Sequence, residues 1–159
     1  MLLRLESRSA ADTQRIGEIL GRHSQAGDVL GLSGDLGAGK TELVRGLARG
    51  LDIDPDVIYS PSFTLVAEHE GRLRLNHIDL FRLGEPVSSQ EEEEIGLTEY
   101  LSPVGVTAVE WHRKLRSAPV AWTLEANFAI GGGDRRTVVF EGRGARGEAI
   151  LGALQATWR

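Results

Sequence analysis

The sequence contains no cysteine among its 159 residues. This absence excludes disulfide bonds, thiol catalysis and cysteine-ligated metal sites, and it agrees with a reducing compartment. The chain also lacks any apolar run that approaches the roughly 20 residues of a membrane-spanning helix. We therefore expect a soluble, cytoplasmic protein that does not associate with membranes.

Lysine is nearly absent, and the net charge is negative. Lys40 and Lys114 are the only lysines among 18 basic residues, and the formal net charge is −5. Non-specific affinity for nucleic acids comes mostly from neutralisation of phosphates, so an acidic chain is poorly suited to it. We expect no DNA binding, and we expect any contact with RNA to be local or made through a partner protein.

One of the two lysines lies in the glycine-rich segment GDLGAGKT at residues 34–41. This segment fits the phosphate-binding loop pattern of a glycine, four free positions, a second glycine, a lysine and a hydroxyl residue. An apolar run at residues 28–33 precedes it, and an amphipathic pattern at residues 40–51 follows it. The order of strand, loop and helix predicts a site for a nucleoside triphosphate.

The residue types in this loop suit phosphate chemistry. Gly34, Gly37 and Gly39 adopt positive φ readily and carry no Cβ, so backbone N–H groups can turn toward phosphate oxygens at the N-terminus of the following helix. Lys40 supplies a slim positive charge for the β- and γ-phosphates, and the Thr41 hydroxyl is a ligand for the bridging Mg²⁺.

The length and the absence of a linker that could divide the chain predict a single domain over residues 1–159. The hydrophobic pattern predicts closely spaced elements. The uniformly apolar run at 104–109 predicts a central parallel strand. Residues 63–69 and 72–79 predict the two strands of a hairpin that turns at residues 70–71. Further strands are expected at 2–6, 28–33, 121–130 and 137–141, helices at 9–25, 40–51, 87–101 and 145–157, and a loop at 55–61. The sum is a three-layer α/β fold with a mixed, mainly parallel central sheet.

A phosphate-binding loop needs a further carboxylate to organise the magnesium ion, usually at the end of a neighbouring strand. Glu110 follows the apolar strand and has the better local pattern, whereas Asp79 ends the segment LNHID. Asp79 is a candidate for orienting the attacking water or for holding the metal from the other side. His77 and His112 have no second ligand at suitable spacing, so no zinc site is expected.

Five segments together resemble one family. They are GDLGAGKT, SPSFTLV at 60–66, HIDLFRL at 77–83, EEIGLTEYL at 93–101 and VEW at 109–111. Their order and spacing are similar to those of the TsaE family, the small YjeE-type ATPases of bacterial tRNA threonylcarbamoyladenosine biosynthesis. The resemblance covers nearly the whole chain and implies the P-loop NTPase fold.

The resemblance implies that the chain binds and hydrolyses ATP with Mg²⁺, slowly when alone. It also implies two larger partners, TsaB- and TsaD-type proteins, which transfer threonylcarbamate to the adenosine beside the tRNA anticodon. A TsaE protein does not itself transfer that group, so its contact with tRNA would be indirect.

Motif matching carries the family's functional residues onto this chain. Lys40, Asp79 and Glu110 would be catalytic, Thr41 and Glu110 would bind Mg²⁺, and Asp79 would be catalytic or linked to the metal. The predicted nucleotide-binding set is Thr13, Gly34, Gly37, Ala38, Gly39, Lys40, Thr41, Glu42, Ser60, Ser62, Phe63 and Arg136. Ser60, Ser62 and Phe63 would belong to a switch-like loop near the γ-phosphate, and Thr13 would lie near the base. Ser62 and Glu42 depart from the usual residues of the family, which are threonine and a second hydroxyl residue.

Other functional classes share the phosphate-binding loop. A small-molecule kinase would ordinarily add a mobile arginine-bearing lid, and no long insertion provides one here. A nucleotide-gated binding module with little turnover also remains open. A GTP switch is excluded, because the guanine-reading Asn-Lys-x-Asp motif is impossible with lysines only at positions 40 and 114.

Overall fold

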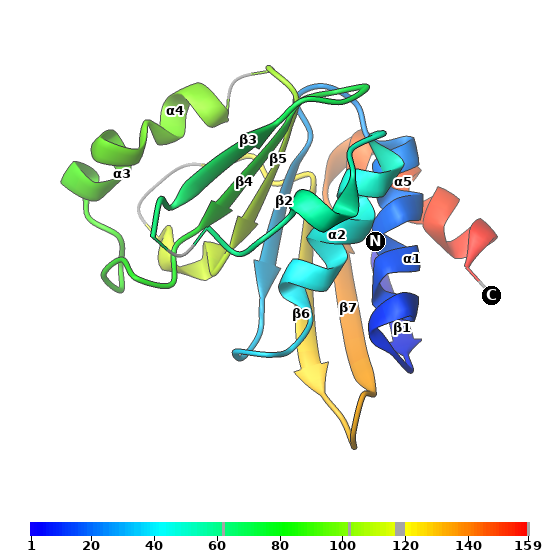
Figure 1. Cartoon of the computed structure of the whole chain (residues 1–159). Coiled ribbons are helices and arrows are strands. Elements are labelled where there is room, and N and C mark those ends of the chain that lie inside the picture. Colours follow the sequence, from blue (N-terminus) through cyan, green and yellow to red (C-terminus); the bar gives the residue numbers. More distant parts are fainter. Residues whose placement is uncertain (62, 102, 117–119, 159) are drawn as a thin grey trace.

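The computed structural model describes residues 1–61, 63–101, 103–116 and 120–158. All strands form one seven-stranded sheet in the order β1-β7-β6-β2-β5-β4-β3 (Figure 1). The strands are β1 (Leu2–Ser7), β2 (Val29–Ser33), β3 (Val66–His69), β4 (Leu75–Asp79), β5 (Val106–Glu110), β6 (Leu124–Ile130) and β7 (Arg136–Gly142). The α-helices are α1 (Ala10–His23), α2 (Lys40–Gly50), α3 (Ser89–Ile95), α4 (Leu97–Tyr100) and α5 (Gly144–Thr157).

The centre of the sheet is parallel and its margins are antiparallel. β6, β2, β5 and β4 form a continuous parallel block, whereas β7 pairs antiparallel with both β6 and β1, and β3 pairs antiparallel with β4. Every residue of β2, β4 and β5 is buried. The predicted mixed, mainly parallel α/β fold is confirmed.

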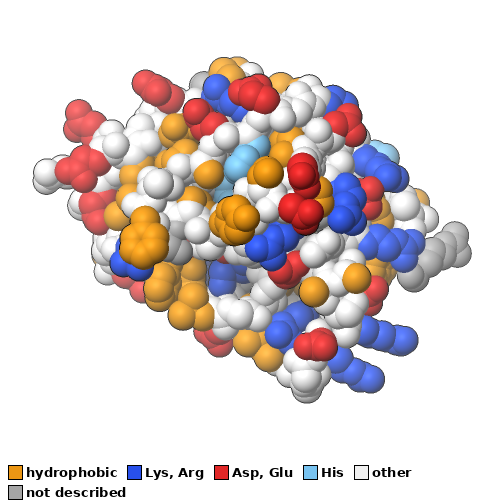
Figure 2. Space-filling model, viewed as in Figure 1, with side chains coloured by type: hydrophobic (Ala, Val, Ile, Leu, Met, Phe, Trp, Pro, Cys, Tyr) orange, Lys and Arg blue, Asp and Glu red, His pale blue; other side chains and the backbone are white. Residues whose placement is uncertain are grey.

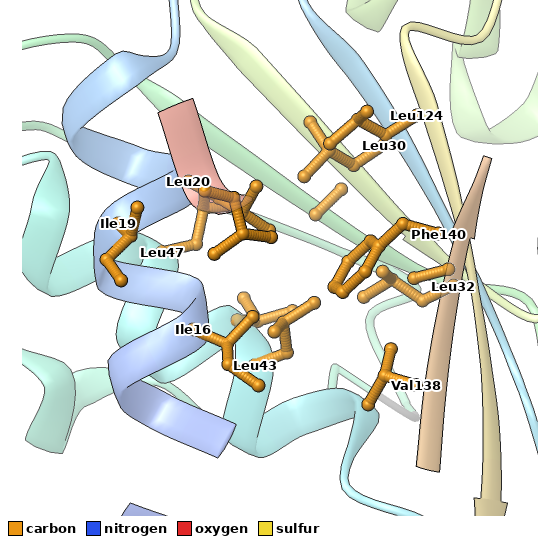
Figure 3. Packing of buried hydrophobic residues seen from close by; sticks show 14 of the residues in the cluster. Ile16, Ile19, Leu20, Leu30, Leu32, Leu43, Leu47, Leu124, Val138 and Phe140 are labelled. Carbon is orange, nitrogen blue, oxygen red and sulfur yellow. The ribbon is translucent and has the colours of Figure 1, made fainter. Parts of the chain in front are cut away.

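Helices α1, α2 and α5 cover one face of the sheet. Their apolar residues meet alternate residues of the strands in one large core, part of which is shown in Figure 3. The labelled side chains are Ile16, Ile19, Leu20, Leu30, Leu32, Leu43, Leu47, Leu124, Val138 and Phe140. This core fixes the start of α2 relative to the end of β2, which is where the phosphate-binding loop lies.

Helices α3 and α4 belong to the other face and cover only part of it. Their core contains Ile78 and Val109 from β4 and β5, packed with Val87, Leu97 and neighbouring apolar residues. Over β1, β6 and β7 this face carries exposed side chains such as Arg4, Asn127 and Glu141 instead. The third layer is therefore confined to one half of the sheet.

Helices α1 and α2 approach each other so closely that glycine is required at their contact. A Cβ at Gly17 would overlap the backbone oxygen of Leu43, and one at Gly46 would overlap the backbone oxygen of Gln14. The two backbones therefore pack directly against each other. This contact brings the first turn of α1 beside the first turn of α2.

Several element boundaries differ from the sequence-based expectations. The helix predicted at 87–101 is two short helices, because Gly96 adopts a left-handed conformation with φ of 71° between them. The loop at 55–61 contains a 3₁₀ turn, η1 (Pro55–Val57). β3 begins at Val66, later than predicted, because the chain before it forms a tight turn in which Leu65 has φ of 67°. β4 begins at Leu75, also later than predicted, because residues 71–73 form bends before the strand. Within the described part of the chain, no helix is both long and apolar enough to cross a bilayer.

Candidate nucleotide-binding site

The phosphate-binding loop connects the carboxyl end of β2 to the N-terminus of α2. Gly34, Gly37 and Gly39 have positive φ values of 143°, 78° and 107°. A Cβ on Gly34 would also lie 2.8 Å from the backbone oxygen of Phe128. Glycine is thus needed here both for the backbone conformation and for the close approach to β6. The loop presents backbone N–H groups at the positive end of α2, which suits an anion.

A cavity of about 410 Å³ opens in front of this loop. The loop and the first turn of α2 supply Leu36, Gly37, Ala38, Gly39, Lys40, Thr41 and Glu42, and the rest of the lining comes from Ser60, Asp79, Phe81, Arg82, Glu110 and Trp111. All three predicted catalytic residues, Lys40, Asp79 and Glu110, therefore line one cavity. The segments that meet here are far apart in the sequence, and the parallel strand order brings them to one edge of the sheet.

Lys40 is buried against the loop and an aromatic ring. Its Nζ donates a hydrogen bond to the backbone oxygen of Gly34 and another, 2.9 Å long, to that of Asp35. The ammonium also lies 4.3 Å from the centre of the Trp111 ring. Burial lowers the pKa of Lys40 from its ordinary value, and the nearby Glu110, Asp79 and Asp35 carboxylates oppose this shift without reversing it.

Thr41 and Glu110 meet directly at the floor of the cavity. The Thr41 hydroxyl lies 3.2 Å and 3.1 Å from Oε1 and Oε2 of Glu110. Glu110 is the last residue of β5 rather than the residue after it, and its side chain is almost fully buried. The hydroxyl and the carboxylate are oxygen donors of the kind that Mg²⁺ prefers.

Asp79 lies beside Glu110, because the two residues are register partners at the ends of β4 and β5. Its Oδ2 accepts a hydrogen bond from the Ser60 hydroxyl at 2.5 Å, and its Oδ1 accepts one from the backbone N–H of Phe81 at 2.9 Å. No group of three or more His, Cys, Asp or Glu residues forms a metal cluster among the described residues. Asp79 and Glu110 thus place two carboxylates side by side at the ends of these strands.

Of the predicted switch-like loop, which comprises Ser60, Ser62 and Phe63, only Ser60 is seen to line this cavity among the described residues. Ser60 lines it, whereas Phe63 is 86 % exposed and lies under the Arg82 guanidinium, 4.3 Å from the ring centre. Phe63 lines a separate, more apolar cavity with Tyr59 and Val57. Ser62 lies outside the described residues.

Thr13, Glu42 and Arg136 gather on the other side of the loop, around a small cavity of about 90 Å³. Arg136 donates a hydrogen bond of 3.2 Å to the backbone oxygen of Gly37. The Glu42 carboxylate accepts hydrogen bonds from Arg45 and from Gln14, the latter at 2.6 Å. The hydroxyl of Thr13 is buried and lies 2.7 Å from that of Ser7, so the polar groups of Thr13 and Glu42 are held by the protein itself.

Two site features were missed by the sequence reasoning. His77, considered there only as a metal ligand, is fully buried and directs Nε2 at Oε2 of Glu110 from 2.5 Å. The alternation of β4 was the available signal, because His77 and Asp79 are two residues apart and share a face. The contact between Trp111 and Lys40 had no comparable signal, since it depends on a left-handed Trp111 backbone with φ of 63°.

Charge around the site is mixed. On the face shown in Figure 2, acidic side chains predominate on the side of α3 and α4, and basic side chains predominate on the opposite side. This distribution differs from the continuous basic surface that is typical of proteins that bind nucleic acids directly.

Comparison with known proteins identifies the family. The model of the family described as threonylcarbamoyl adenosine biosynthesis protein TsaE matches residues 7–138. The chain belongs to the TsaE family. A TsaE relative from Treponema pallidum is 40% identical over 128 residues, which cover 80% of this chain and 92% of the relative. The TsaE protein of Bacillus subtilis is 35% identical over 144 residues, or 90% and 87% of the two chains.

A solved structure shares the fold of this chain. The crystal structure of Bacillus subtilis YdiB superposes with a TM-score of 0.80 at 30% sequence identity, covering 98% of this chain and 95% of that one. The predicted family and the predicted fold class are both confirmed. TsaE relatives carry the name tRNA threonylcarbamoyladenosine biosynthesis protein.

Proposed function

We propose that this chain is a Mg²⁺-dependent ATPase of tRNA threonylcarbamoyladenosine biosynthesis. The observation that carries the proposal is the contact between Thr41 and Glu110 at the foot of the phosphate-binding loop. A hydroxyl residue at this position and a strand-end carboxylate are the protein groups that hold Mg²⁺ in P-loop NTPases. The names of the relatives from Treponema pallidum and Bacillus subtilis support the biosynthetic role.

In this proposal the loop amides and Lys40 bind the phosphates of ATP, and Thr41 and Glu110 hold the metal. When bound, Mg²⁺ neutralises charge on the phosphates. The Lys40 ammonium has three N–H donors, and the carbonyl oxygens of Gly34 and Asp35 take two of them, which leaves one donor for a phosphate oxygen. Asp79 either orients the attacking water or holds the metal from the side opposite Glu110.

The chain acts with TsaB- and TsaD-type proteins, and we expect its hydrolysis of ATP to be slow without them. Contact with tRNA is then made through these partners, which agrees with the net charge of −5. Because tRNA modification takes place in the bacterial cytoplasm, the proposal also assigns the chain to that compartment.

The decisive experiment compares ATP hydrolysis by the wild-type chain and by Lys40→Ala, each alone and with TsaB- and TsaD-type partners plus tRNA. We expect stimulation of the wild-type chain by the partners and loss of at least about 100-fold in Lys40→Ala, because a charge contact to the transferring group is removed. Lys114→Ala, which removes the chain's other lysine, is the matched control and should retain stimulation.

A different outcome would redirect the assignment. Absence of stimulation, together with phosphate transfer from ATP to a small metabolite, would make the chain a kinase. The likeness to TsaE would then reflect a shared fold without a shared activity.

A further inference from the structure

The imidazole of His77 lies beneath the carboxylate of Glu110 and is sealed from solvent. Its ring is 0% exposed, and Nε2 lies 2.5 Å from Oε2 of Glu110. The other ring nitrogen, Nδ1, has no hydrogen-bond partner among the described residues. Among the described residues, the His77 side chain therefore forms a hydrogen bond only with Oε2 of Glu110.

The direction of this hydrogen bond follows from the surroundings of the ring. A neutral imidazole carries one proton, on either nitrogen. With the proton on Nε2, the ring donates to the carboxylate and leaves an unpaired acceptor at Nδ1. With the proton on Nδ1, it would leave a buried N–H without an acceptor, and unpaired buried N–H groups are the rarer case in proteins. His77 is accordingly a donor to Glu110.

The two Glu110 oxygens differ in their contacts. The Thr41 hydroxyl is within hydrogen-bonding distance of both oxygens, whereas His77 contacts Oε2 alone. A glutamate side chain has three rotatable bonds, and the neighbouring Asp79 carboxylate repels it. A fixed donor on Oε2 therefore restricts the plane of the carboxylate and holds both oxygens within hydrogen-bonding distance of the Thr41 hydroxyl.

We propose that His77 is a positioning residue that holds Glu110 in the orientation required for binding Mg²⁺. This inference rests on the proposed function, because it assigns His77 a role toward the metal of that site. Hydrogen bonds to ligating carboxylates fix their geometry, and loss of such a partner typically weakens metal binding by 10- to 100-fold. His77 acts through Glu110 and does not itself contact the nucleotide or the metal.

The experiment measures metal binding rather than turnover. Mn²⁺, which substitutes for Mg²⁺ and is visible by electron paramagnetic resonance, is titrated into each protein with a non-hydrolysable ATP analogue. We expect His77→Ala to weaken Mn²⁺ binding by about 10- to 100-fold and to leave nucleotide binding in EDTA unchanged. His77→Gln should recover most of the Mn²⁺ affinity, because the glutamine amide can present an N–H near the position of Nε2. Glu110→Ala marks the effect of removing the ligand itself.

A matched control separates positioning from strand packing. Asn76 directly precedes His77 in β4, and its side chain is also 0% exposed. It points to the face of the sheet opposite His77, where its Nδ2 donates a hydrogen bond to the Thr107 hydroxyl. Asn76→Ala should lower the melting temperature and leave the Mn²⁺ affinity of the folded protein unchanged. Equal weakening in Asn76→Ala, or in His77→Gln, would reduce His77 to a packing residue and overturn the inference.

The outcomes also separate this inference from the proposed function. Unchanged Mn²⁺ affinity in His77→Ala, alongside partner-stimulated hydrolysis by the wild-type chain, would overturn the positioning role and leave the ATPase intact. Failure of the wild-type complex to bind Mn²⁺ would overturn both proposals.

Discussion

The charge of Lys40, which we propose binds phosphate, lies in an environment that disfavours it. The side chain is only 5% exposed and lies against the Trp111 ring, and burial is the largest influence on its lowered pKa. The folded chain therefore binds this proton less tightly than the unfolded chain does. The charged lysine weakens folding at neutral pH, and this effect disappears as the pH rises between the lowered pKa and 10.5.

A neutral side chain of similar length should therefore stabilise the nucleotide-free protein. We expect Lys40→Met to raise the melting temperature at pH 7 by about 2–4 °C, the shift that ~1 kcal/mol gives in a domain of this size. The difference from wild type should shrink at pH 10. Differential scanning fluorimetry of both proteins at pH 7 and pH 10 measures these differences in melting temperature.

Lys114→Met is the control for this substitution. Lys114 donates hydrogen bonds of 2.8 Å and 3.0 Å to the backbone oxygens of Phe81 and Leu83. Lys114 is only partly buried, so its removal relieves less desolvation than removal of Lys40 does, and the loss of these two hydrogen bonds should lower the melting temperature at pH 7. A Lys40→Met protein that is less stable than wild type at pH 7 would contradict the argument.

The residues of the site were predictable where a local pattern determines them. The glycines and Lys40 belong to one contiguous motif, and Glu110 was found because a carboxylate stands at the end of a buried strand. The pairing of His77 with Glu110 depends on the register of β4 against β5, which joins residues 33 positions apart. A single sequence contains no local signal for that register.

Among the elements, α1 and α2 pack backbone against backbone beside the site. Gly17 and Gly46 let the two helical backbones touch, and the same contact sets Gln14 against Glu42 in the first turn of α2. The helices themselves were predictable from their apolar stripes. The close approach was not predictable, because glycines within a helix do not reveal which backbone will face them.

The break between α3 and α4 was not predictable either. It depends on the left-handed Gly96, which interrupts an otherwise helical acidic pattern.

Substitution at this contact should be strongly destabilising. We expect Gly46→Ala to lower the free energy of unfolding by about 3 kcal/mol, because the new Cβ would overlap the Gln14 backbone and force the helices apart. Urea denaturation followed by circular dichroism measures the change.

Gly152→Ala provides the same substitution without the overlap. Gly152 lies within α5, and a Cβ there meets nothing within 4 Å. Alanine should stabilise this helix by about 0.5–1 kcal/mol through its higher helix propensity. Similar unfolding midpoints for the two variants would contradict this prediction, because they would mean that α1 and α2 can move apart at little cost in free energy.

At the scale of the whole molecule, the sheet has a protected centre and one weak margin. β2, β4 and β5 are buried at every residue, whereas β3 is an edge strand with no fully buried residue. The fold class followed from the alternation of strand and helix patterns. The strand order did not, because β1 pairs with β7 across almost the whole chain, and such non-local pairing has no signature in local periodicity.

Hydrogen exchange should reveal this gradient. We expect the amides of β3 that bond to β4 to exchange at least about 100-fold faster than those of β2, because opening an edge strand exposes far less apolar surface than opening the core. Exchange measured by NMR at neutral pH gives the comparison. Equal protection of the two strands would mean that the sheet opens only as one unit.

The strand order also determines when during synthesis the site becomes complete. The phosphate-binding loop emerges from the ribosome early, directly after β2. Both neighbours of β2 in the sheet, β5 and β6, are made much later, as are Glu110 and Arg136, and β1 has no partner until β7 is present. A nascent chain that ends before β5 therefore carries the full glycine motif without the carboxylate beside it. If the proposed site binds nucleotide, we therefore expect nucleotide to assist folding only after β5 and β6 have been translated.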